Sequence, residues 1–118
     1  MQVSKKKINP KIEKQIFGLL YQVVNDLKNP QEIRDFLSAI LTKTELEAIV
    51  KRLAVAHYLD KGRTYENIKK SLSVSSATIA AVQEQVAKGK GFGLALEKIK
   101  AEEWADKWAK KISQLVKR

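Results

Sequence analysis

The sequence contains no cysteine and no long apolar run. The absence of cysteine from its 118 residues excludes disulfides and thiolate metal sites, and it fits a reducing compartment, where disulfides rarely persist. No stretch approaches the roughly 20 apolar residues that cross a bilayer, and the lysines after Met1 have no apolar signal core behind them. We therefore expect a soluble, cytoplasmic protein that does not enter a membrane.

The sequence also has little that catalysis or metal binding needs. His57 is its only histidine, and it falls on the apolar side of an expected helix, where a packed side chain is commoner than a ligand. The acidic pairs Glu45/Glu47 and Glu102/Glu103 are one or two residues apart, so neither pair shares a helical face. No nucleophile, zinc or dinucleotide motif occurs. The sequence predicts no enzyme, no cofactor and no metal site.

A glycine-rich stretch at residues 89–93 resembles a phosphate-binding loop only superficially. It is Gly-Lys-Gly-Phe-Gly, and three glycines in five residues predict a flexible loop. No strand is expected before it, and no Gly-Lys-Ser/Thr ending follows, so the pattern of a nucleotide-binding loop is incomplete. We expect a connection between two helices here.

A surplus of basic residues dominates the composition. The formal net charge is +10 and the isoelectric point is near 9.8. Such a surplus favours polyanionic partners, with nucleic acid first among them. The basic residues are spread along the chain, so they do not mark one patch, and a solvated cationic surface is the alternative interpretation. The composition therefore suggests double-stranded DNA as a partner without locating the surface that binds it.

Apolar residues at helical spacing predict one helix after another. Asn-Pro pairs precede two of them, because asparagine caps a helix and proline suits its first turn. Thr42 and Glu45 have the spacing of a capping box. After a flexible basic tail at residues 1–8, we expect a single all-α domain of six helices over residues 9–118. Apart from a central hairpin, the expected helices cover residues 10–28, a segment from Pro30 to about Leu41, a segment from Thr42 to Gly62, and residues 94–116.

The segment from Thr64 to Val82 predicts two short helices joined by a tight turn, which is the pattern of a helix-turn-helix. Its apolar residues fall where such a motif buries them, with one in the turn. Hydroxyl side chains can cap both helices, Thr64 the first and Ser75 or Ser76 the second. An ordinary helical hairpin is the alternative interpretation. The inward positions are Ile68, Leu72, Val74, Ile79 and Val82, and the whole motif extends over about residues 64–88.

The apolar stripes of the outer helices exceed what one chain of this size can hide, so we expect a homodimer. Trp104 and Trp108, four residues apart with alanines between them, are more typical of a core or dimer contact than of a ligand site. A membrane-surface helix is the competing interpretation, and the acidic residues among its lysines disfavour it. The expected interface residues are Ile16, Leu20, Val23, Val24, Leu27, Phe36, Trp104 and Trp108.

An ordered combination of motifs resembles a known family. The run Leu41-Thr42-x-x-Glu45-x-Glu47-Ala48-Ile49-x-x-Arg52 precedes Gly62 and a helix-turn-helix with Ala77-Thr78-Ile79. This combination resembles the Trp repressor superfamily of bacterial regulators. Residues 91–97, Gly-Phe-Gly-Leu-Ala-Leu-Glu, resemble its Trp-repressor-like branch that is not obviously tied to tryptophan. The resemblance covers about residues 30–100, and it implies an all-helical homodimer with interlaced N-terminal helices.

The resemblance also implies where an effector would bind. Family members hold tryptophan between two arginines, and Arg52 matches the first of them. The second falls at Ala81, so the expected partner of the ligand carboxylate is missing, a contact worth roughly 1.5–3 kcal/mol. We expect the tryptophan site to be lost and no small-molecule effector to bind.

For DNA, the resemblance implies that Thr78 keeps a hydroxyl of the recognition helix and that Lys69 keeps a lysine of the preceding helix. Glu66 stands where the family has an arginine that contacts a base, and Ala80 stands where a hydroxyl is expected. The expected DNA-binding residues are Thr64, Lys69, Lys70, Ser75, Ser76, Ala77, Thr78 and Ala80.

Two functions follow from these observations. The first is a sequence-specific transcriptional regulator that reads the major groove with the helix starting near Ser76. The second is a helical protein-interaction module whose helix-turn-helix is degenerate and no longer reads DNA. DNA binding that weakens with salt and prefers one sequence would distinguish the first from the second.

Overall fold

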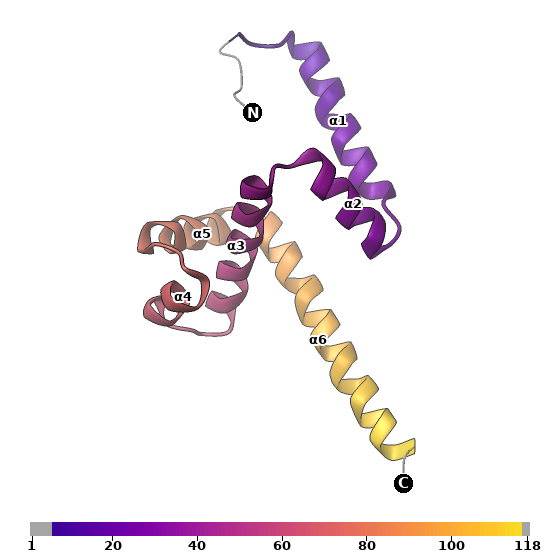
Figure 1. Ribbon diagram of the computed structural model, residues 1–118, viewed down its shortest axis with the longest axis vertical. Coiled ribbons are helices and arrows are strands. Elements are labelled where there is room, and N and C mark those ends of the chain that lie inside the picture. Colours follow the sequence, from indigo (N-terminus) through magenta and orange to yellow (C-terminus); the bar gives the residue numbers. More distant parts are fainter. Residues whose placement is uncertain (1–5, 117–118) are drawn as a thin grey trace. The chain divides into compact units, whose positions relative to one another are not determined.

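The described part of the chain, residues 6–116, is built from helices alone in the computed structural model (Figure 1). The prediction of an all-α fold with six helices is confirmed. Residues 6–8, the described end of the predicted basic tail, are not helical, and the rest of that tail lies outside the described residues. The helices are α1 (Pro10–Asp26), α2 (Pro30–Ile40), α3 (Lys43–Asp60), α4 (Tyr65–Leu72), α5 (Ser76–Lys88) and α6 (Gly91–Val116).

Side-chain caps fix the starts of the first three helices where the sequence predicts them. The amide oxygens of Asn9 and Asn29 accept backbone N–H bonds at the starts of α1 and α2. Thr42 and Glu45 form a reciprocal capping box: Glu45 N donates to Thr42 Oγ1 over 3.1 Å, and Thr42 N donates to Glu45 Oε1 over 2.8 Å. The backbone bond, with the hydroxyl contact second, lowers the pKa of Glu45 below its ordinary value.

The chain divides into two compact units. The first, which ends at Leu46, contains α1 and α2. No residue of these two helices is buried, and α1 exposes large apolar side chains on successive turns. The expectation of one domain over residues 9–118 stays a prediction. Exposed apolar residues of α1 include Ile12, Ile16, Leu20 and Val24.

The second unit, from Glu47 on, contains the hydrophobic core. Helices α3, α4, α5 and α6 all contribute fully or nearly fully buried side chains. The predicted inward residues Ile68, Ile79 and Val82 are among them, and Leu72 and Val74 pack against the same core. The core therefore forms around the helix-turn-helix. Its buried members are Val55, Ala56, Ile68, Ile79, Val82 and Leu96.

The prediction for residues 91–93 is wrong in one respect. They form the first turn of α6, which begins at Gly91 and not near Leu94, so the flexible connection is shorter than expected. Leu94 N donates to the carbonyl of Lys90 over 3.0 Å. Phe92 packs against the core, and burial of its ring anchors a turn whose glycines alone disfavour a helix.

Helix α3 ends at Asp60, two residues before Gly62, where the sequence predicts its end, and Gly62 lies in the turn that follows. Its φ of 78° lies in the left-handed region, where glycine has no steric penalty. Its N–H donates to the carbonyl of Leu59 over 3.0 Å. The bond and the turn direct the chain from α3 into α4.

None of the helices in the described range is long and apolar enough to cross a membrane.

Candidate nucleic-acid interface

Hydroxyl caps position the two helices of the hairpin. Thr64 Oγ1 accepts from Asn67 N over 3.1 Å at the start of α4, and Ser75 Oγ accepts from Thr78 N over 3.1 Å at the start of α5. Ser75, rather than Ser76, is therefore the cap of the second helix. Ser75 Oγ and Thr78 Oγ1 are also 3.0 Å apart and share a hydrogen bond. Both capping side chains thus have a structural role beside the contacts with DNA that the sequence suggests.

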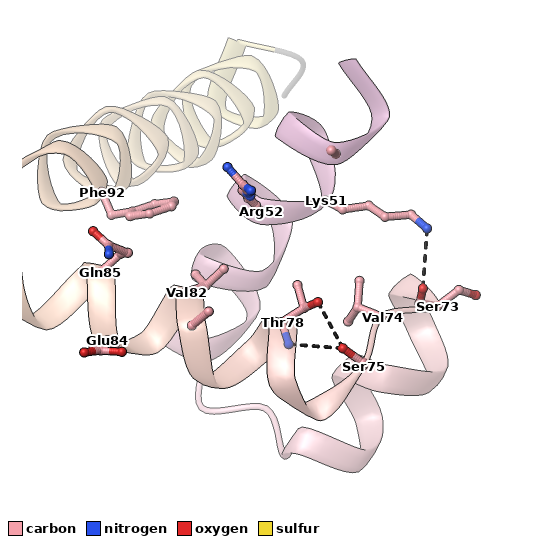
Figure 2. A pocket seen from close by; sticks show the side chains of 12 residues that line it. Lys51, Arg52, Ser73, Val74, Ser75, Thr78, Val82, Glu84, Gln85 and Phe92 are labelled. Atoms are coloured by element: carbon pink, nitrogen blue, oxygen red, sulfur yellow. Dashed lines mark hydrogen bonds between the residues drawn. The ribbon is translucent and has the colours of Figure 1, made fainter. Parts of the chain in front are cut away.

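The turn between α4 and α5 is tight and tied to α3. Ser73, which caps the end of α4, has a φ of 52° in the left-handed region, which is rare for a residue other than glycine. Lys51 Nζ donates to the carbonyl of Ser73 over 3.4 Å (Figure 2). Val74 packs inward beside this turn, so the start of α5 is held from both sides.

A shallow depression on the hairpin brings three of the predicted DNA-binding residues together. Lys69 and Lys70 of α4 and Ser76, the first residue of α5, line it. Glu66 lines it too, so a carboxylate lies among the cations. Two lysines beside a helix N-terminus form a positive surface where backbone N–H groups also favour an anion. The complete lining is Tyr65, Glu66, Lys69, Lys70, Val74 and Ser76.

The remaining predicted contacts lie outside this depression. Ala77 and Ala80 are exposed on α5, and Thr64 is exposed at the start of α4. Thr78 is half-buried and faces a second cavity. The residues predicted from sequence thus divide between the depression, the exposed surface of α5, the start of α4 and the second cavity, which Ser75 lines as well.

The second cavity lies between α3, α5 and the start of α6, with a volume of about 770 Å³ (Figure 2). Arg52 and Ala81, the two positions that the resemblance assigns to a tryptophan site, both line it. The structure therefore brings these two positions together, and only one of them, Arg52, carries a positive charge. Lys51 and Glu84 add one charge of each sign. The lining residues are Ala48, Lys51, Arg52, Ser73, Val74, Ser75, Thr78, Ala81, Val82, Glu84, Gln85 and Phe92.

Several residues near the site were not predicted from the sequence. Glu84, Gln85 and Phe92 line the second cavity, and the hydroxyl of Tyr65 forms a hydrogen bond with Gln83 Oε1 that joins α4 to α5. Thr78, Ala81 and Gln85 follow each other at spacings of three and four residues, which places them on one face of α5. That spacing could have identified Gln85. Nothing in the sequence indicates the distant residue Phe92.

His57 belongs to a surface cluster that lies outside both the depression and the second cavity. Its Nε2 lies 3.6 Å from Glu103 Oε1, and Lys61 Nζ donates to Glu103 Oε2 over 2.6 Å. The lysine bond is the largest cause of a lowered pKa for Glu103. This cluster joins α3 to α6. Within residues 6–116, no group of three or more metal-ligating side chains comes together.

Comparison with known proteins agrees with this fold. The family model of the Trp repressor protein matches residues 15–99, which include the hairpin, the depression and the second cavity. The chain belongs to the Trp repressor family. This family consists of regulatory DNA-binding proteins and not of enzymes, and the resemblance predicted from the sequence is confirmed.

Two relatives extend the comparison. A Bacillus subtilis (strain 168) protein named YerC, described as uncharacterized, is 31% identical over 85 residues, which are 71% of this chain and 82% of that protein. The crystal structure of a TrpR like protein from Eubacterium eligens ATCC 27750 superposes with a TM-score of 0.69 at 29% identity. That match covers 77% of this chain and 95% of the other. The fold of this Trp repressor family member is therefore shared almost over the full length of the solved relative.

Proposed function

We propose that this protein is a cytoplasmic, sequence-specific DNA-binding regulator of transcription that reads the major groove with α5. The observation that carries the proposal is the construction of the hairpin. Its apolar face is buried around Ile68 and Ile79, while the start of α5 stays exposed beside Lys69 and Lys70. Family membership supports the same function.

In this proposal, two kinds of contact have different roles. Lys69 and Lys70 bind phosphates, which position the protein without reading sequence. Thr64 accepts a backbone N–H bond as a cap, and its hydroxyl hydrogen can donate to phosphate. Ser75 also accepts such a bond and shares a further bond with Thr78 Oγ1, so it can donate to phosphate only when Thr78 is the donor in that bond. The residues that contact base edges are Ser76, Ala77, Thr78 and Ala80.

We also propose that the protein binds DNA as a homodimer through interlaced N-terminal helices. Helices α1 and α2 have no buried residue in a single chain, although α1 exposes apolar side chains along its length. Association would cover these side chains. The two copies of α5 would then enter successive major grooves, whose centres are about 34–36 Å apart. The interface would include Ile16, Leu20, Val23, Val24, Leu27 and Phe36.

The cavity at Arg52 is not a tryptophan site in this proposal. Ala81 supplies no cation from α5, and Glu84 in the same lining repels a carboxylate. Arg52 is exposed, so water can solvate its charge when no ligand is bound. Regulation by tryptophan is not part of the proposed function.

Fluorescence anisotropy tests the proposal. Labelled duplexes selected from a random pool and a scrambled duplex of equal length are titrated with protein at several salt concentrations. We expect affinity that falls steeply with salt, as released counterions require, and binding to the selected duplex at least 1,000-fold tighter than to the scrambled one, as is typical of specific recognition. Equal affinity for both duplexes, or binding that ignores salt, would instead favour a protein-interaction module.

A further inference from the structure

The residues proposed for base contacts include few groups that can form hydrogen bonds with a base. Ala77 and Ala80 are exposed but offer only a methyl group. Thr78 is half-buried, and its hydroxyl already shares a hydrogen bond with Ser75. Ser76 is therefore the one exposed polar side chain among them. Because base edges are read largely through hydrogen bonds, a reader built on α5 needs a further polar side chain.

Gln83 supplies such a side chain. Ser76, Ala80 and Gln83 follow each other at spacings of four and three residues, which places them on one side of α5. Gln83 is exposed and lies about 10 Å along the helix from Ser76. Only the short methyl group of Ala80 stands between the two, so the longer amide side chain can reach beyond the surface of the helix.

Tyr65 holds the amide of Gln83 in one orientation. Its hydroxyl forms a hydrogen bond with Gln83 Oε1, and the hydroxyl is the donor because a carbonyl oxygen can only accept. Tyr65 is the first residue of α4, a position fixed by the cap bond from Asn67 N to Thr64 Oγ1. The tyrosine also lines the depression at the start of α5, so the amide that it holds lies at the edge of the candidate DNA surface.

We propose that Gln83 reads an adenine in the major groove and that Tyr65 orients its amide for this contact. The inference rests on the proposed function as a DNA-binding regulator. When Oε1 accepts from the tyrosine, it keeps one lone pair, and Nε2 keeps two hydrogens. Within residues 6–116, Nε2 donates to no other group. One acceptor and one donor are therefore available to a base.

Adenine is the base that matches this pair of groups. In the major groove it presents N7 as an acceptor and N6 as a donor, whereas guanine presents two acceptors, cytosine one donor, and thymine one acceptor beside a methyl group. A free amide can turn about its last bond and exchange its donor with its acceptor. The bond to Tyr65 opposes that turn. The tyrosine is thus a positioning residue, and discrimination against other bases depends on its hydroxyl.

Two simpler roles for the pair lead to different results. A bond that only joins α4 to α5 contributes to stability, and its loss weakens binding to every duplex alike. A contact with phosphate likewise has the same strength on every duplex, because phosphate carries no sequence information. Only a contact with a base changes the preference at one base pair.

A base-pair scan tests the inference in the full-length protein. Each base pair of the selected duplex is replaced in turn, and anisotropy measures the affinity of the unchanged chain and of Q83M, a variant that keeps the length of the side chain. We expect the unchanged chain to lose about 5-fold to 150-fold in affinity when one adenine in each half-site is replaced. Q83M should be indifferent to that replacement and keep its preferences at the other positions.

A modified base sharpens this test. The analogue 7-deazaadenine lacks the N7 acceptor but keeps N6. Placed at the position that the scan identifies, it should weaken binding of the unchanged chain and leave binding of Q83M as it was.

Two further variants provide the controls. Q85M makes the same chemical change on the opposite side of α5, since two residues turn a helix by about 200°, and its scan should match that of the unchanged chain. Y65F removes only the hydroxyl and should lower the discrimination at the adenine by about 5-fold. In a Q83M background Y65F should have no further effect, because the tyrosine acts through the amide. Circular dichroism should show the same helical content in all variants.

The inference is overturned if Q83M keeps the preference at every base pair or weakens all duplexes equally. It is also overturned if Q85M changes the scan as Q83M does, or if Y65F lowers discrimination further in the Q83M background. Failure of the proposed function gives another result, which overturns both proposals: the unchanged chain would prefer no duplex, and its scan would show no position that matters.

Discussion

Replacement of the two lysines beside α5 provides the sharpest test of the proposed DNA contacts. Lys69 and Lys70 line the depression at the start of α5, and neither forms an ion pair within residues 6–116. The variant K69Q/K70Q removes both charges while it keeps most of each side chain. Because the two side chains are exposed, we expect the fold to stay intact.

The expected effect follows from counterion release. Each lost phosphate contact lowers the slope of log K against log salt by about 0.9, so the slope of the variant should be shallower by about 1.8. At 0.1 M salt the same relation predicts DNA affinity lower by about 60-fold. The loss should be nearly equal for selected and scrambled duplexes, because phosphate contacts carry no sequence information.

Anisotropy titrations at four or more salt concentrations measure both quantities. The matched variant K90Q/K98Q removes one charge just after the end of α5, about 20 Å from the start of that helix, and one charge from α6. Its slope should match that of the unchanged protein. If K69Q/K70Q keeps the full slope, or if K90Q/K98Q loses as much, the hairpin surface does not hold the DNA.

Three further measurements test the fold and the cavity. The side chain of Ile79 is fully buried. Its replacement by alanine should lower the free energy of unfolding, measured in urea, by about 2–5 kcal/mol. The pKa values of Glu45 and Glu103 are lowered in the folded protein. Their contribution to the free energy of unfolding is therefore complete above the unfolded pKa of about 4.3 and is lost as the pH falls through the lower folded pKa values. The E103Q variant should show a smaller fall of melting temperature at acid pH than the unchanged protein. Calorimetry with L-tryptophan should show no saturable heat, whereas A81R should restore weak binding at the cavity.

Much of the fold was predictable because local signals and burial agree. The capping residues Asn9, Asn29 and Thr42 act where their sequence context indicates, and Ile68 and Ile79 are fully buried as the pattern of the hairpin requires. These features depend on neighbours within a few residues. Local sequence therefore determines them almost completely.

The errors arise where distant residues decide the outcome. Three glycines predict a loop at residues 89–93, but α6 begins at Gly91, and Phe92 in its first turn packs against the core. The ion pair between Lys61 and Glu103 likewise joins residues that no local pattern connects. The cavity around Arg52 was located only through the family resemblance, because its lining comes from three helices and a turn.

Glu66 is the residue that most distinguishes this hairpin from an ordinary phosphate-binding surface. It lies in the same depression as Lys69 and Lys70, where its carboxylate repels phosphate, although it forms no ion pair with either lysine within residues 6–116. A carboxylate is useful to a DNA-binding protein at a base edge, since it accepts a hydrogen bond from cytosine N4, whereas arginine donates to guanine. An exchange of arginine for glutamate at this position therefore inverts the hydrogen-bonding preference and leaves the lysines to provide the affinity. Within the proposed function, Glu66 would therefore add a base contact from α4 to the contacts made by α5, and the base preference would differ from that of an arginine-bearing hairpin.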